Sequence, residues 1–256
     1  MTRITSVNNI LILAGDAEGN LGDKAIMQST CSELLSLRPG LSISIISKEK
    51  NPLPGKQNIY AIRPGISGFL QLIHAARDAD IILCGGGGLF QDDDSLIKMP
   101  YWAIRLLLVR LFCNNIIGYS LGVGPLSAPT SRFFARLAFS CMRRISTRDP
   151  IAQNTAQKLT RKPVTIVPDP ALLLQDLSEK QAKKHPLIQD IKNLKKPLVG
   201  EAIRRWFPAK ARLVPNKIAA KFGSKNKTAV KQSDQLCRLI AKVLDELVIK
   251  HNAYIV

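Results

Sequence analysis

The feature of this chain that most constrains its fold is a run of four glycines that comes directly after a short apolar segment. Ile81-Ile82-Leu83-Cys84 is followed by Gly85-Gly86-Gly87-Gly88 and then by Leu89-Phe90-Gln91-Asp92. The apolar segment predicts a buried strand, and the glycines predict a loop without side chains that leads to a helix. In α/β proteins such a loop presents backbone N–H groups to a phosphate or a carboxylate. The alternative interpretation is that the glycines only form a tight turn.

Similar loops follow other apolar segments of the chain. Gly19-Asn20-Leu21-Gly22-Asp23 follows the segment at 10–13, and Gly122-Val123-Gly124-Pro125-Leu126 and Pro168-Asp169-Pro170 follow later ones. Strands that alternate with helices and end in Gly, Asp or Arg predict an open, doubly wound parallel sheet of the α/β class. The expected strands are 10–13, 41–47, 81–84, 115–121, 143–147 and 164–167, and the expected helices are 24–37, 69–77, 101–112, 131–142 and one that begins at Pro150 with Asp149 as its N-cap.

The pattern predicts two domains of unequal completeness. We expect an N-terminal Rossmann-like domain over 1–193 and the start of a second Rossmann-like domain over 194–256. The second begins with an expected strand at 197–200, continues with an amphipathic helix capped by Ser233, and ends in Tyr254-Ile255-Val256, which predicts another strand. One strand and one helix cannot bury the apolar stripe of this helix, so we expect the second domain to be incomplete.

The net charge of +18 is concentrated late in the chain. Between Ser178 and Lys231 there are 15 Lys and Arg residues against three acids, so +12 of the +18 lies in this basic segment. Such a segment attracts polyanions. Its aromatic residues lack the stacking pattern of an RNA-binding surface, so no nucleic-acid partner is expected. Peripheral association with an anionic membrane is the favoured interpretation, and a merely solvated basic surface is the alternative.

The composition also predicts a compartment. The five cysteines are scattered without a C-x-x-C pair and there are only three histidines, so no structural zinc site is expected. Free thiols fit a reducing cytoplasm. The N-terminus lacks a signal-peptide pattern, and the apolar stretch from Tyr101 to Ile117 is interrupted by Arg105 and Arg110. We therefore expect a cytoplasmic protein, with the inner face of the plasma membrane as its place of peripheral association.

The order of the glycine- and aspartate-containing blocks resembles that of the polysaccharide pyruvyl transferases, a family of GT-B-like architecture. No single block is specific, but four or five of them in this order and spacing over residues 10 to 206 are fairly specific. The blocks are Gly19 to Asp23, Gly85 to Asp92, Gly122 to Leu126, Arg148-Asp149 with Asp169-Pro170-Ala171, and Val199-Gly200 with Ile203-Arg204-Arg205-Trp206.

The resemblance implies an activity. Members of the family transfer the enolpyruvyl group of phosphoenolpyruvate onto two hydroxyls of a sugar, which gives a pyruvate ketal and inorganic phosphate. Phosphoenolpyruvate is then the donor substrate, and no separate cofactor or metal is expected. The implied acceptor is a saccharide or a lipid-linked saccharide of a cell-surface polysaccharide. A donor with a phosphate and a carboxylate suits backbone amides and guanidinium groups, and ketal formation needs an acid and a base.

On this basis the candidate catalytic residues are Asp23, Asp92 and Arg148, with Asp149 as a further available carboxylate. The candidate donor-binding residues are Asn20, Gly22, Gly85, Gly86, Gly87, Gly88, Gln91 and Arg204. Structural roles are the open alternatives. Helix capping would explain Asp23 and Asp149, a turn between prolines would explain Asp169, an ion pair with a neighbouring acid would explain Arg148, and surface charge would explain Arg204.

The chain also departs from the family pattern. Lys24 stands where an acid is common, Ala152 stands where a serine is common, and the family's second-domain segment with an Arg and a His has no counterpart, since His251 does not match it. If the protein ended at Val256, we would expect an interdomain cleft without one wall and little or no transferase activity. The competing hypotheses are a GT-B glycosyltransferase that uses a nucleotide sugar and a non-catalytic, basic, membrane-associated remnant.

Overall fold

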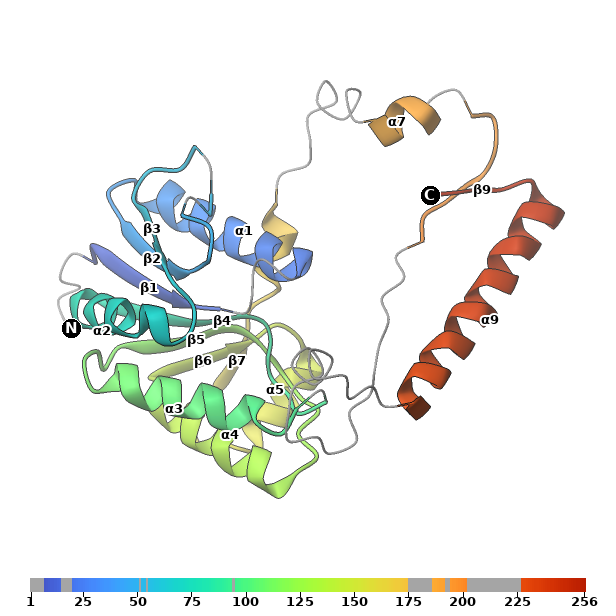
Figure 1. The fold of residues 1–256 in the computed structure, drawn as a ribbon. Helices are drawn as coiled ribbons and strands as arrows, with labels where there is room; N and C mark the ends of the chain where they lie inside the picture. Colours follow the sequence, from blue (N-terminus) through green and yellow to red (C-terminus); the bar gives the residue numbers. More distant parts are fainter. Residues whose placement is uncertain are drawn as a thin grey trace. The chain divides into compact units, whose positions relative to one another are not determined.

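The computed structural model describes residues 7–14, 20–50, 52–53, 55–93, 95–174, 186–191, 194–201 and 227–256 (Figure 1). Its contacts divide the chain into two compact units, and the first contains the described residues through Leu174. Residues 175–185 and 192–193, on which the predicted boundary at 193/194 depends, lie outside the described residues. That boundary therefore stays a prediction.

The first unit is built on a seven-stranded sheet in which every neighbouring pair of strands is parallel. The strands lie in the order β3-β2-β1-β4-β5-β6-β7, which reverses direction between β1 and β4. This order is that of doubly wound α/β folds, and it confirms the predicted fold class. The strands are β1 (Asn9–Leu13), β2 (Ser42–Ile46), β3 (Ile59–Ile62), β4 (Ile81–Phe90), β5 (Ile116–Val123), β6 (Arg144–Thr147) and β7 (Val164–Ile166).

Helices cover both faces of this sheet, with α1 on one face and α3 and α4 on the other (Figure 1). The apolar run of β1 supplies both cores, because successive side chains of a strand point to opposite faces. Ile10 and Ile12 pack with α1, whereas Leu11 and Leu13 belong to the larger core under α2 to α5. The helical elements are α1 (Leu21–Leu37), η1 (Ile66–Gly68), α2 (Phe69–Asp78), α3 (Lys98–Arg110), α4 (Pro129–Cys141), α5 (Pro150–Gln157) and η2 (Pro170–Leu173).

Three details differ from the sequence-based expectations. The four glycines do not form a loop after a strand, because β4 continues through them to Phe90 and pairs with β5, with Gly85 opposite Tyr119 and Gly87 opposite Leu121. Gly22 and Asp23 lie inside the first turn of α1, which begins three residues earlier than expected. The edge strand β3 has no expected counterpart, since its four residues carry little alternation of apolar and polar side chains.

The described part of the second unit contains α7 (Pro186–Ile191), β8 (Leu198–Val199), α9 (Lys227–His251) and β9 (Tyr254–Ile255). β8 and β9 are parallel neighbours, so α9 connects them as the crossover helix of a βαβ unit. Ser233 lies within α9 and is not its cap, because the helix begins at Lys227. In the described parts of the chain, none of the helices has the length and apolar character needed to cross a bilayer.

Candidate functional site

The candidate site lies at the carboxyl edge of the sheet, where the strand order reverses. β1 and β4 are neighbours there, and the helices that follow them, α1 and α3, lie on opposite faces of the sheet. In open α/β sheets, ligands bind at such a switch point because the two diverging connections leave a crevice between them. The first turn of α1 and the glycines of β4 both belong to this region.

Asn20 begins α1. Its backbone is extended, with φ of −146°, and its Oδ1 accepts a hydrogen bond from the N–H of Gly22 at 3.0 Å. Asn20 is therefore the N-cap, and the capping role considered for Asp23 belongs to it. Asp23 follows in the first turn, where the helix dipole favours a carboxylate.

Close packing is enough to explain why residues 85 and 86 are glycines. A Cβ atom at Gly85 would lie 1.9 Å from the carbonyl oxygen of Tyr119 on β5, and one at Gly86 would lie 2.2 Å from Cγ2 of Ile26 on α1. Gly86 also has φ of 77°, a conformation that side chains disfavour. These two glycines let β4 approach β5 and α1 closely, which is a structural role. Their predicted role in donor binding stays a prediction.

Gly87 brings a carboxylate and a guanidinium to the same stretch of backbone. A Cβ atom at Gly87 would lie 2.5 Å from Oδ1 of Asp23. A Cβ atom at Gly122, on the neighbouring strand, would lie 2.9 Å from the carbonyl oxygen of Gly87 and 3.3 Å from Cζ of Arg148. The missing side chains therefore allow Asp23 and Arg148 to approach β4 and β5 directly.

Gly88 and Gln91 also lie together. A Cβ atom at Gly88 would lie 2.6 Å from Oε1 of Gln91, so the Gln91 side chain folds back over the last glycine of the run. An amide side chain in this position has both a donor and an acceptor to offer a ligand. Gly88 and Gln91 remain donor-binding candidates.

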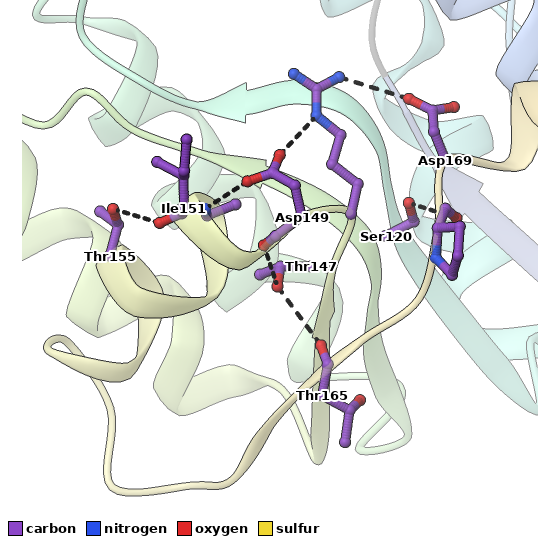
Figure 2. Close-up of polar contacts among 10 residues, drawn as sticks. Ser120, Thr147, Asp149, Ile151, Thr155, Thr165 and Asp169 are labelled. Atoms are coloured by element: carbon purple, nitrogen blue, oxygen red, sulfur yellow. Dashed lines mark hydrogen bonds and ion pairs between the residues drawn. The ribbon is translucent and has the colours of Figure 1, made fainter.

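Arg148 lies between two carboxylates at the end of β6. Its Nε is 3.5 Å from Oδ2 of Asp149, and its Nη1 is 3.5 Å from Oδ2 of Asp169 (Figure 2). The side chain is 39% exposed, so both ion pairs are screened by water. A guanidinium carries five N–H donors, and two long ion pairs orient it while leaving donors for a ligand.

Asp149 and Asp169 use their two carboxylate oxygens in the same way. Oδ1 of Asp149 accepts from the N–H of Ala152 at 2.7 Å and caps α5, as predicted with Pro150 at the first helical position. Oδ1 of Asp169 accepts from the N–H of Ala171 at 3.0 Å and caps η2. In each residue Oδ2 is the oxygen that contacts Arg148. Both aspartates therefore act structurally, and both also hold the arginine.

Asp92 has a structural role, and its predicted catalytic role stays a prediction. The residue is 7% exposed, and its oxygens accept from the N–H of Ser127 at 3.0 Å and of Ala128 at 2.8 Å. These donors lie directly before α4, so Asp92 joins the segment after β4 to the segment after β5. Both oxygens of a buried carboxylate are thus occupied by backbone donors, which does not suit proton transfer to a substrate.

The structure adds Tyr119 and Ser120 to this region, and neither residue belongs to the motifs that point to a site in the sequence. Burial raises the pKa of Tyr119, and the carboxylates of Glu33 and Asp169 raise it further. Ser120 has φ of 47°, and its Oγ donates to the carbonyl of Pro168 at 3.2 Å, beside Asp169 (Figure 2). The one sequence signal that could have pointed to these two residues is their position just before the Gly122 block.

Carboxylates and a guanidinium lie together at this edge. Asp23 approaches Gly87, Arg148 approaches Gly122, and Asp149 and Asp169 are paired with Arg148. The predicted cation Arg204 lies outside the described residues. Within the described residues, no group of three or more His, Cys, Asp or Glu side chains is arranged to hold a metal ion.

The fold defines an α/β protein of doubly wound type, with the candidate site at the switch point of its parallel sheet. The polysaccharide pyruvyl transferase profile matches residues 20–250, and the chain belongs to this family of transferases. Comparison with curated proteins gives no match.

Among solved structures, the chain is similar to a Rossmann-fold NAD(P)-binding family protein from Shigella flexneri, with 17% identity, coverage of 73% of this chain and 86% of that one, and a TM-score of 0.38. It is also similar to the ADP-heptose lipopolysaccharide heptosyltransferase II of E. coli, with 14% identity, coverage of 75% and 53%, and a TM-score of 0.33.

Proposed function

We propose that this chain transfers the enolpyruvyl group of phosphoenolpyruvate to a sugar of a cell-surface polysaccharide or its lipid-linked precursor. The observation that carries the proposal is the placement of Arg148 against Gly122, on the strand next to the glycine run, where Asp149 and Asp169 hold its guanidinium. A guanidinium oriented in this way pairs with a phosphate or a carboxylate, and phosphoenolpyruvate has both groups.

The proposed reaction has two steps. One sugar hydroxyl adds to the central carbon of the donor, while the methylene carbon takes a proton and becomes a methyl group. A second hydroxyl then displaces inorganic phosphate and closes the ketal. Asp23 is the proposed proton-transfer group, because its carboxylate lies against Gly87 within the glycine run.

The carboxylates of this edge suit the acceptor, because sugar hydroxyls can donate to Asp23, Asp149 and Asp169. A donor with several negative charges is stabilised by more than one cation. Arg204 is the proposed second cation for the donor, from its position after the expected first strand of the second domain. This assignment rests on the family resemblance.

The first experiment is a thermal-shift titration of the whole chain with phosphoenolpyruvate, inorganic phosphate and uridine diphosphate. We expect phosphoenolpyruvate to raise Tm, since a ligand that binds only the folded state stabilises it by about 2.7 kcal/mol at 100 times its Kd. Arg148→Ala should abolish this shift. Arg144→Ala is the matched control, because Arg144 is an exposed arginine at the start of the same strand, β6.

Each outcome identifies one of the hypotheses. A shift with phosphoenolpyruvate that Arg148→Ala abolishes supports the proposal and justifies an assay of phosphate release with saccharide acceptors. A shift with uridine diphosphate alone favours a glycosyltransferase that uses a nucleotide sugar. A protein that responds to none of the three ligands, although folded, favours the non-catalytic alternative.

A further inference from the structure

The outer face of α3 is apolar and exposed. Ile97, Tyr101, Ile104 and Leu111 recur at the three- and four-residue spacing that places side chains on one face of a helix. Their exposed fractions are 45%, 51%, 61% and 77%. The opposite face of α3 is buried, so this second stripe is not needed for the core. Exposed apolar surface of this kind indicates an interaction site.

The same part of the chain is strongly basic. No Asp or Glu occurs between Ser95 and Arg148. The basic residues in that range are Lys98, Arg105, Arg110, Arg132, Arg136, Arg143, Arg144 and Arg148. Of these, Arg136 on α4 and Arg143 and Arg144 after it are exposed, whereas Arg148 belongs to the carboxyl-edge site. The first unit therefore has a cationic surface on and after α4 that does not come from the basic segment at 178–231.

α3 and α4 carry the apolar and cationic groups on one continuous layer. The two helices pack side by side on the same face of the sheet (Figure 1). Nη1 of Arg110 donates to the carbonyl of Cys141 at 2.8 Å, which joins their C-terminal ends. Leu111 and Phe112 follow directly on one helix, and the exposed Arg143 and Arg144 follow on the other. Exposed apolar groups and guanidiniums therefore meet at this end of the layer.

Tyr101 and Arg105 link the stripe to a cation. Nη1 of Arg105 donates to the hydroxyl of Tyr101 at 2.6 Å, and its guanidinium carbon lies 5.6 Å from the centre of that ring. An aromatic ring with a polar tip beside an arginine is the combination that residues at membrane–water interfaces use.

We propose that the α3–α4 layer is a docking surface for an anionic lipid bilayer, with the α3 stripe inserted among the headgroups and the flanking arginines paired with lipid phosphates. Apolar insertion and phosphate pairing together are what a monotopic interfacial helix requires. The surface is distinct from the carboxyl-edge site, so the inference does not depend on the identity of the donor.

Charge complementarity favours a lipid surface over other occupants. A second copy of this chain would bring the same arginines against themselves, because a symmetric dimer pairs identical patches. A nucleic acid would use the arginines but would gain nothing from exposed Ile104 and Leu111, which cannot stack on bases. An anionic bilayer uses both features of the layer.

The first test measures binding of the whole chain to vesicles by co-sedimentation, and protection from hydrogen exchange by mass spectrometry. Vesicles of phosphatidylcholine alone are compared with vesicles that also contain phosphatidylglycerol. We expect binding only to the anionic vesicles, with new protection in peptides that cover residues 97–112. Absence of protection there would overturn the proposal even if the chain binds through another segment.

The second test separates the stripe from the rest of the surface. The double variant Ile104→Ser/Leu111→Ser should reduce the partition onto anionic vesicles by about tenfold or more, because two aliphatic side chains no longer leave water. The matched control is Ile66→Ser/Ile151→Ser, whose side chains are 96% and 79% exposed on η1 and α5. It should bind like the parent protein.

A third variant tests the charge. Arg136→Glu/Arg143→Glu should weaken binding by about fivefold or more per residue changed, since one basic residue near an anionic surface contributes about that factor. It should also flatten the salt dependence of binding. The proposal would be overturned if Ile104→Ser/Leu111→Ser bound anionic vesicles as well as the parent protein does. It would also be overturned if the control variant Ile66→Ser/Ile151→Ser lost binding equally. A dimer of the parent protein that Ile104→Ser/Leu111→Ser dissociates would overturn it as well.

Discussion

Nη1 of Arg148 lies 3.5 Å from Oδ2 of Asp169, although α5 and β7 separate the two residues along the chain. Asp149 approaches the same guanidinium from the other side, again through Oδ2. Each aspartate uses Oδ1 to cap a helical segment, so the arginine is held by two groups that are themselves fixed to the backbone. An exposed arginine restrained in this way is oriented before any ligand arrives, which reduces the entropy lost on binding.

Asp149 provides a test of charge at the site. Asp149→Asn keeps an oxygen for the N-cap of α5 but removes the negative charge beside Arg148, so we expect little change in stability. Binding of phosphoenolpyruvate should tighten by about twofold to fivefold, because a competing surface ion pair is removed while Asp169 still orients Arg148. Asp149→Ala is the matched variant and should cost about 1 kcal/mol of stability through the lost cap. Weaker donor binding in Asp149→Asn would contradict this account.

Asp92 should prove structural. Replacing it with Ala leaves the buried N–H groups of Ser127 and Ala128 without their acceptor, and we expect a loss of about 2–4 kcal/mol in the free energy of unfolding. Urea denaturation measures this loss. The thermal shift caused by phosphoenolpyruvate should persist in the folded fraction. A variant with normal stability that no longer turns over substrate would support the catalytic assignment instead.

Gly86 should couple energetically to Ile26. Gly86→Ala places a Cβ atom 2.2 Å from Cγ2 of Ile26, so one of the two must move. In an Ile26→Ala background the contact is absent, and the same substitution should cost only the backbone strain of φ 77°, about 1–2 kcal/mol. Gly40→Ala is the control, because nothing lies within 4 Å of its Cβ position. Additive losses in the cycle would refute the contact.

The buried thiols should be unreactive. Burial raises the pKa of Cys31 and of Cys84 to about 12, so the reactive thiolate is scarce at neutral pH. Cys237 on α9 is partly exposed and should react first with a thiol-specific reagent. Mass spectrometry of the modified peptides checks this order. Cys31 and Cys84 should become reactive only in denaturant, and their early modification would contradict the packing described around them.

Asp80 should contribute stability that disappears in acid. The N–H groups of Asn8 and Asn9 donate to its Oδ2 at 2.7 and 3.0 Å, and these bonds lower its pKa in the folded protein. A depressed folded pKa stabilises the protein above the unfolded pKa of about 3.9, and the contribution is lost as pH falls through the folded value.

The measurement for Asp80 compares urea unfolding of the parent and Asp80→Asn across this pH range. The parent should be slightly more stable at neutral pH, since Asp80 is exposed and its interactions are screened. The difference should vanish in strong acid. A difference that grows as pH falls would show that the carboxylate does not act through these bonds.

Most strands and helices of the first unit could be predicted because their signals are local. The apolar run Ile10 to Leu13 shows a strand buried on both faces, and Asp149-Pro150 marks the start of a helix, as the structure confirms. The glycine run was misread as a loop, because a lack of side chains looks the same whether the backbone faces a ligand or packs against Tyr119 and Ile26.

By itself, the sequence determined the α/β class, the order of the blocks at the strand ends and the family to which they belong, since hydrophobic period and residue type are written along the chain. Only the tertiary structure decided that Asp23 and Arg148 approach glycines of neighbouring strands, Gly87 and Gly122, that Asp92 joins two loops, and that an apolar stripe is left exposed on α3. The physical reason is that such contacts depend on strand order: β4 is inserted between β1 and β5, which brings segments far apart in sequence to one edge of the sheet.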